Sequence, residues 1–216
     1  MIASLLLVAS AALQAAEVTE PNTQVKFPVV LTAATAGAGA AGGDDQALTG
    51  TGVRTRTIAK VKVYAFGLYV DPAGARSALA AWRGKKASDL WDDQAFYDVI
   101  TKGSFPMTLR LVMTRDVGGA QMAEALSDAL GSRMTGNTEA LDTFRGFFTK
   151  DLAKGTEILF ARNGNKLKVV FDGQAAGEID NAVLPWALFD VYLGKKPISG
   201  EGKETVVSRM PELLGS

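Results

Sequence analysis

The chain has 216 residues, 47% of them apolar and 21% charged, and its 23 Lys and Arg residues balance its 23 Asp and Glu residues. This length suits one domain with its own core, and the lack of a basic excess argues against nucleic acid as a partner. Because the sequence has no His and no Cys, it excludes Ser/His and Cys/His nucleophiles, zinc sites of the usual nitrogen and sulfur type and CxxC redox pairs.

The N-terminal residues have the pattern of a secretory signal peptide. Residues 2–13 are apolar or small, and small residues continue to Ala16 before the first charged side chain. The run is too short to cross a bilayer. No basic side chain precedes it, so an upstream start or a buried strand are the alternatives. We expect residues 1–15 to be removed, residues 16–24 to form a short lead, and residues 25–216 to form one exported domain, periplasmic or extracellular.

The next segment predicts a strand followed by a long loop. Residues 25–32 are mostly apolar, and Pro28 favours an edge or the start of a strand. The residues from there to Gly52 are dominated by Gly, Ala and Thr and show no apolar period. Residues 37–42 match the GxGxxG pattern, but a dinucleotide site also requires a helix directly after the last glycine. No helix fits there, so we interpret this segment as a loop.

Strands and helices then alternate in groups. Residues 53–58 and 61–70 are rich in β-branched and aromatic side chains and predict an antiparallel hairpin. Two helices are predicted next, over residues 74–84 and 88–101. In the second, Ser88 is the expected cap and Trp91 lies on the apolar side. The alternation of apolar and polar side chains then predicts a strand over residues 104–114.

The second half of the chain continues this pattern. Residues 118–130 predict a helix with Met122, Leu126 and Ala129 on one face, ended by Gly131. The other expected elements are a helix over residues 138–152, a hairpin of residues 157–162 and 166–171 around Asn163-Gly164-Asn165, and helices over residues 181–193 and 200–214. The order predicts an α+β fold in which helices pack on one face of a mostly antiparallel sheet.

Several segments together resemble the chalcone isomerase family. The resemblance rests on VKFPVVL, LTGTGVR, KVKVYAFGLYVD, FYDVITKGSFPMTLRLVM, GTEILF and NAVLPWALFDVYLGKKPIS, which follow the family's order and spacing after Gln24. It implies an open-faced β-sandwich, in which a large antiparallel sheet curves against a layer of helices with a ligand cleft between them.

The resemblance also implies candidate site residues. The family's enzymes bind a phenolate with an Arg and polarise a ketone with a Thr, Tyr and Asn network. Arg54 takes the Arg position, Tyr64 the Thr position, Met122 the Tyr position and Ala129 the Asn position. Met and Ala cannot donate a polarising hydrogen bond, so we expect no catalytic residues. The pair of Arg and Tyr is instead similar to that of the family's non-catalytic fatty-acid-binding members.

We therefore expect a binding protein for a fatty acid or similar amphipathic carboxylate, without a metal or other cofactor and without a membrane span. A guanidinium binds a carboxylate through two hydrogen bonds, and a phenol adds a neutral donor. If residues 58–60 form a three-residue loop, Arg54 lies opposite Tyr64 on one face of the hairpin. The expected ligand-binding residues are Arg54, Tyr64, Met122, Leu126, Ala129 and Phe148.

Two other functions stay open. An isomerase or intramolecular lyase would use Arg54 to hold an oxyanion and Tyr64 to donate a proton to a conjugated enone. A protein-interaction module of the cell envelope would instead use a sheet edge or the C-terminal helix, with the cleft filled by its own side chains. The structural alternatives are that Arg54 pairs with a surface carboxylate, that Tyr64 is a core aromatic residue and that the face of Met122 only packs.

Overall fold

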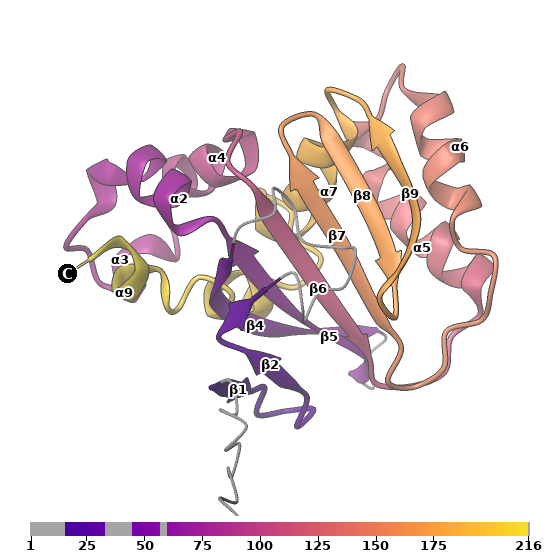
Figure 1. Ribbon diagram of the computed structural model, residues 1–216, viewed down its shortest axis with the longest axis horizontal. Helices are drawn as coiled ribbons and strands as arrows, with labels where there is room; N and C mark the ends of the chain where they lie inside the picture. Colours follow the sequence, from indigo (N-terminus) through magenta and orange to yellow (C-terminus); the bar gives the residue numbers. More distant parts are fainter. Residues whose placement is uncertain (1–15, 33–44, 57–59, 216) are drawn as a thin grey trace, which may run out of the picture.

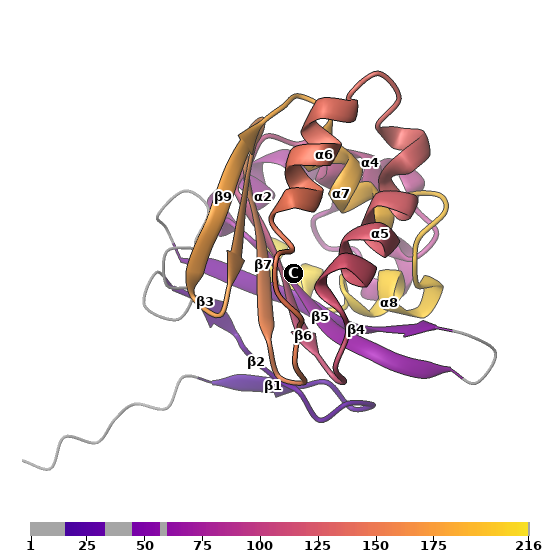
Figure 2. The same cartoon turned by 90° about the vertical axis from the view of Figure 1, so that its right-hand side faces the viewer.

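The computed structural model describes residues 16–32, 45–56 and 60–215. Within these ranges one antiparallel sheet has the strand order β3-β4-β5-β6-β7-β8-β9, and helices cover one of its faces (Figures 1 and 2). The strands are β3 (Val30–Leu31), β4 (Gln46–Arg56), β5 (Val61–Val70), β6 (Met107–Met113), β7 (Glu157–Asn163), β8 (Lys166–Phe171) and β9 (Gln174–Asp180). The α+β prediction is thus confirmed. The expected signal peptide and the GxGxxG segment lie outside the described residues.

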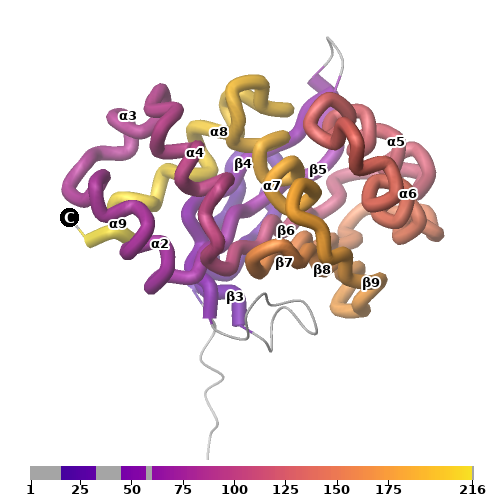
Figure 3. The backbone as a smooth tube through the Cα atoms, turned by 90° about the horizontal axis from the view of Figure 1, so that it is seen from above, coloured from indigo at the N-terminus to yellow at the C-terminus, as the bar shows by residue number. Residues whose placement is uncertain are grey.

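The helical layer consists of two groups with α7 between them, as the view from above shows (Figure 3). The first group is α2 (Pro72–Ala78), η2 (Ala80–Trp82), α3 (Ala87–Leu90), α4 (Gln94–Lys102) and α9 (Met210–Leu214). On the other side lie α5 (Gly119–Leu130), η3 (Gly131–Arg133) and α6 (Thr138–Gly146), and the C-terminal part adds α7 (Leu184–Leu193) and α8 (Gly200–Thr205). No helix in the described part of the chain is long and apolar enough to span a bilayer.

Each face of the sheet has its own apolar cluster. The larger one lies between the sheet and the helices, where Phe66 of β5, Leu111 of β6 and Leu188 of α7 are fully or almost fully buried. A smaller one on the opposite face centres on Phe27. Phe27 belongs to β2 (Lys26–Pro28), which pairs with β1 (Glu17–Thr19) in a separate antiparallel ribbon. The expected N-terminal lead therefore contains a strand.

The predicted long loop ends earlier than expected. Strand β4 begins at Gln46, and its pairing with β5 continues past Gly50 and Gly52 to Arg56. Because glycine is depleted in strands, the sequence around these glycines predicted a loop and not a strand. The glycines are needed here because α8 packs directly on β4: a Cβ at Gly50, whose φ is +154°, would lie 2.2 Å from the carbonyl oxygen of Thr205.

Several predicted helices are shorter than their apolar periods suggested. The helix predicted over residues 74–84 divides into α2 and η2 at Leu79, and that over 200–214 divides into α8 and α9. The helix predicted over 138–152 ends at Gly146. Gly131 does not stop α5 in a left-handed conformation, because its φ is −39° and η3 follows directly.

The helix predicted over residues 88–101 divides into α3 and α4. Asp93, not Ser88, caps α4, because its carboxylate accepts the backbone N–H of Phe96 at 3.1 Å. Ser88 lies inside α3. Trp91 lies between the two helices and is 42% exposed, so it does not belong to the buried side as predicted.

Two elements near the ends of the sheet also differ from the prediction. The strand predicted over residues 25–32 divides into β2 and β3 after Pro28, which lacks the N–H that a continuing ladder requires. Strand β9 was not predicted. It is the edge strand of the main sheet, and most of its side chains are at least partly exposed, so it lacks an apolar alternation.

A buried cation connects the sheet to α4. The guanidinium of Arg162 on β7 donates to the carbonyl oxygens of Thr101 at 2.7 Å and Ile100 at 3.2 Å, and it lies 4.9 Å from the ring centre of Phe189. Burial lowers the pKa of Arg162 to about 10. The partial negative charge at the C-terminal end of α4 compensates this cation without a carboxylate.

We expect Gly50→Ala to reduce the free energy of unfolding by about 1–3 kcal/mol, because the new methyl group overlaps the backbone of α8. Urea unfolding followed by circular dichroism measures this difference. Gly146→Ala is the matched control: a Cβ there meets nothing within 4 Å, and alanine is favoured over glycine in a helix, so the change should be neutral or stabilise by up to about 1 kcal/mol. Equal stabilities of the two variants would contradict the close contact between α8 and β4.

Candidate functional site

A cleft of about 490 Å³ opens between the hairpin end of β4 and β5 and one side of α5. Its volume lies in the range of small-molecule sites. The lining residues are Arg54, Arg56, Val61, Val63, Tyr64, Arg115, Asp116, Val117, Gln121, Met122, Ala125, Leu126, Asp128, Ala129 and Ile198. The cleft is thus open, whereas the hypothesis of a protein-interaction module expected it to be filled by its own side chains. The C-terminal helix α9 is also packed, with Met210 and Leu214 buried.

The hairpin places Arg54 opposite Tyr64 at the cleft, as predicted, but the register at its end differs, because Arg56 pairs with Val61, whereas the expected three-residue loop would pair residue 57 with it. The Cα atoms of Arg54 and Tyr64 are direct partners in the β4 and β5 ladder. A bulge follows, because Thr55 pairs with Lys62. Both side chains line the cleft, so the structure brings together the two residues chosen for head-group binding.

Arg54 is held at the cleft wall by a backbone carbonyl. Its Nη1 donates to the carbonyl oxygen of Ile198 at 2.6 Å, across from β4 to the segment between α7 and α8. It forms no ion pair with a carboxylate of the described residues, so the surface-pair alternative is wrong for this part of the chain. A guanidinium has five N–H donors, so several are left for a ligand.

Tyr64 is a buried phenol with a phenolic partner. It is 3% exposed, and its hydroxyl lies 2.9 Å from the hydroxyl of Tyr192 on α7. Burial raises the pKa of Tyr64 to about 12, although the hydrogen bond with Tyr192 and the charge of Arg54 act in the opposite direction. Burial also raises the pKa of Tyr192 well above its ordinary value. Tyr64 therefore stays protonated: its hydroxyl can donate a hydrogen bond but is a poor base.

Tyr192 was not singled out in the sequence. It is part of a helix whose side chains are almost all buried and apolar. A buried tyrosine usually finds a hydrogen-bond partner for its hydroxyl, and this rule was the available signal. The partner lies 128 positions away in the sequence, so only the fold could identify it as Tyr64.

Helix α5 forms one wall of the cleft, which is mostly apolar but also includes Gln121 and Asp128. Met122, Leu126 and Ala129 all line it, as predicted from their spacing. Met122 and Leu126 are also part of the core, with 3% and 2% of their surface exposed. At the two positions where the family resemblance implies a Tyr and an Asn, this chain has Met122 and Ala129, whose side chains are not polar.

Phe148 does not line the cleft. It follows α6, and its ring packs against Phe144 at 5.5 Å and Phe171 at 5.2 Å between ring centres. The helical period that linked Phe148 to the other site residues ends at Gly146. Its role in the structure is aromatic packing of the segment after α6 against β8.

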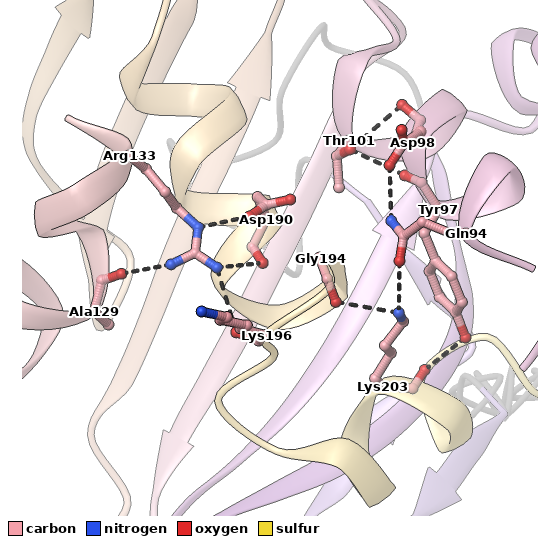
Figure 4. Close-up of polar contacts among 10 residues, drawn as sticks. All are labelled: Gln94, Tyr97, Asp98, Thr101, Ala129, Arg133, Asp190, Gly194, Lys196 and Lys203. Atoms are coloured by element: carbon pink, nitrogen blue, oxygen red, sulfur yellow. Dashed lines mark hydrogen bonds and ion pairs between the residues drawn. The ribbon is translucent and has the colours of Figure 1, made fainter. Parts of the chain in front are cut away.

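Polar contacts fix the segment between α7 and α8 that carries Ile198 (Figure 4). Arg133 Nε pairs with the carboxylate of Asp190 at 2.6 Å, and its Nη2 donates to the carbonyl oxygen of Lys196 at 3.3 Å. Lys203 Nζ donates to the carbonyl oxygen of Gly194 at 3.1 Å. Three cations, with Arg54 as the third, thus hold this segment by its carbonyl groups.

Arg56 and Arg115, which the sequence patterns did not single out, also line the cleft, from β4 and from the segment after β6. The position of Arg56, two residues after Arg54, was a usable signal, since residues i and i+2 share a face of a strand. No group of three or more possible metal ligands occurs among the described residues.

Comparisons with known proteins place these observations in context. Residues 44–207 match a family model described as chalcone isomerase like. The chain is 31% identical over 185 residues to a chalcone–flavanone isomerase of Hordeum vulgare, which covers 77% of this chain and 80% of that protein. The corresponding protein of Oryza sativa subsp. japonica is 30% identical over 187 residues, with the same two coverages. A fatty-acid binding protein of Arabidopsis thaliana, AtFAP1, superimposes with a TM-score of 0.75 at 23% identity, covering 92% of this chain and 99% of that one.

The raised pKa of Tyr64 predicts how the stability of the folded protein changes at alkaline pH. The ordinary tyrosine pKa of 10.0 applies to the unfolded chain, and the folded value is about 12. The stability that this group contributes is therefore complete below pH 10 and is lost as the pH rises toward 12. Between pH 9 and 11 we expect the wild type to lose about 1 kcal/mol more unfolding free energy than Tyr64→Phe. Urea titrations at both pH values measure this, and equal losses would contradict the assignment.

Proposed function

The chain belongs to the chalcone isomerase-like family, and on this premise we propose that it is an exported, non-catalytic protein that binds a fatty acid or similar amphipathic carboxylate. The observation that carries the proposal is the position of Arg54. Its guanidinium lines a cleft whose opposite wall is the apolar face of α5. An amphipathic carboxylate matches both parts of this site.

The geometry of Arg54 suits a carboxylate. Its bond to the carbonyl oxygen of Ile198 uses one donor and orients the planar group, which leaves donors for a bidentate pair. Tyr64 lines the same cleft, and its hydroxyl can donate one further bond if it accepts from Tyr192. Charge-assisted bonds of this kind contribute about 1.5–3 kcal/mol each.

Two further observations support the proposal. The Arabidopsis protein that shares this fold is itself a fatty-acid binding protein. Export is supported by the apolar and small residues 2–13 and the small residues up to Ala16, which match the pattern of a secretory signal peptide.

We expect Arg54→Ala to weaken the binding of hexadecanoate by about 10- to 100-fold, because the head group loses its charged partner. Isothermal titration calorimetry measures the affinity, and native mass spectrometry of the purified proteins compares the acyl cargo. Arg54→Lys retains the charge without the planar fork and should give an intermediate affinity. Arg145→Ala is the control, because this exposed arginine of α6 lies outside the cleft.

Thermal unfolding of each variant shows that it is folded. The proposal fails if wild type and Arg54→Ala carry the same acyl cargo, or if neither carries any and neither binds hexadecanoate.

An isomerase is the second candidate, since the curated relatives with 30% and 31% identity are chalcone–flavanone isomerases. Ring closure requires donors at the position where negative charge develops on the ketone oxygen. Met122 and Ala129 offer none. We therefore expect hydroxychalcones to cyclise at the rate of the buffer, measured by the loss of their enone absorbance. A faster rate that Arg54→Ala abolishes would establish the isomerase instead.

A further inference from the structure

The cleft contains more guanidinium groups than a single carboxylate can engage. Arg54 and Arg56 reach it from β4, and Arg115 reaches it from the segment that follows β6. Two acidic residues, Asp116 and Asp128, line the same cleft. The lining therefore carries three positive and two negative side chains.

One of the two carboxylates is already engaged. Asp116 Oδ1 accepts the backbone N–H of Lys154 at 2.7 Å, which ties the segment after β6 to the segment before β7. Asp128 lies on the last turn of α5. Among the described residues, neither aspartate forms an ion pair with an arginine of the cleft.

The strand register defines where the arginines lie. Arg54, Tyr64 and Met113 are partners across β4, β5 and β6. Arg56 lies two residues after Arg54, and Arg115 lies two residues after Met113. Both therefore lie beyond this row of partners, on opposite sides of β5. The separation between β4 and β6 is two strand spacings, or about 10 Å. Their long side chains can therefore approach one group from both sides, with Arg54 at the inner end.

Neither outer arginine has a side-chain partner among the residues that the structure describes. Arg56 and Arg115 are exposed, and neither forms a side-chain hydrogen bond or ion pair within the described part of the chain. Arg133, in contrast, pairs with Asp190. The two outer guanidinium groups are thus available to a ligand in the cleft.

From this arrangement, and on the basis of the proposed function, we infer that the cleft binds an amphiphile whose head group is doubly charged, such as the phosphate monoester of a long-chain alcohol. A phosphate monoester has a charge between −1.5 and −2 and three strong acceptor oxygens, so it can engage several guanidinium groups at once. A carboxylate has two oxygens and one charge, and Arg54 alone can satisfy it.

The remaining walls explain why the ligand is an amphiphile and not free phosphate. Val63, Val117, Met122, Leu126 and Ile198 line the same cleft as the arginines. An apolar tail that covers these side chains contributes binding energy in proportion to the buried area. Inorganic phosphate has the same head-group chemistry but leaves this surface in contact with water.

The test compares hexadecyl phosphate with hexadecanoate, because the two probes share one tail and differ in the head group. Calorimetric titration of the wild type should give an affinity for hexadecyl phosphate at least about tenfold higher. Arg115→Gln and Arg56→Gln should each reduce that affinity about five- to tenfold, and should reduce the affinity for hexadecanoate by a clearly smaller factor. Arg145→Gln, outside the cleft, should change neither.

The outcomes separate this inference from the proposed function. Equal affinities for the two probes, unchanged in Arg115→Gln, would overturn the doubly charged head group and leave the carboxylate binder intact. If neither probe binds, the proposed function itself fails. Inorganic phosphate that displaces hexadecyl phosphate at an equal concentration would show a plain phosphate site and overturn the amphiphile.

Discussion

The pairing of β4 with β5 determines which side chains meet at the cleft. In β5, Tyr64 and Phe66 face the helices, whereas Ala65 and Tyr69 face the smaller cluster on the other side of the sheet. A shift of the pairing by one residue would exchange these two faces. The large residues on both faces make such a shift costly, so the register that sets Arg54 opposite Tyr64 is strongly specified.

The separation in the sequence between contacting residues explains what the sequence could predict. Local patterns were enough for the β4 and β5 hairpin, for the face of α5 that carries Met122 and Leu126, and for the turn at Gly164. In each case the deciding contacts are between residues close in the sequence, where periodicity and turn chemistry carry information. The family resemblance then selected Arg54 from the other arginines, which the pattern alone does not distinguish.

The features that escaped prediction depend on contacts between distant segments. The start of β4 at Gln46 requires the close approach of α8, and the partner of Tyr192 lies on β5. Phe148 was assigned to the cleft because the apolar period continues past Gly146, although the helix does not. Arg162 looks like an ordinary strand residue in the sequence, and only the fold brings its guanidinium to the carbonyl oxygens at the end of α4.

The distribution of donors around the cleft favours holding an anion over polarising a ketone. The positive charge comes from the strands and from the segment after β6, while α5 contributes Met122 and Ala129 where electrophilic catalysis would need donors. The hydroxyl of Tyr64 is already bonded to that of Tyr192, and its raised pKa makes proton removal difficult. Arg54 is fixed by Ile198, so its donors are oriented before a ligand arrives and little ordering remains to be done on binding. Under the proposed function, a site arranged in this way would stabilise a charge that the ligand already has.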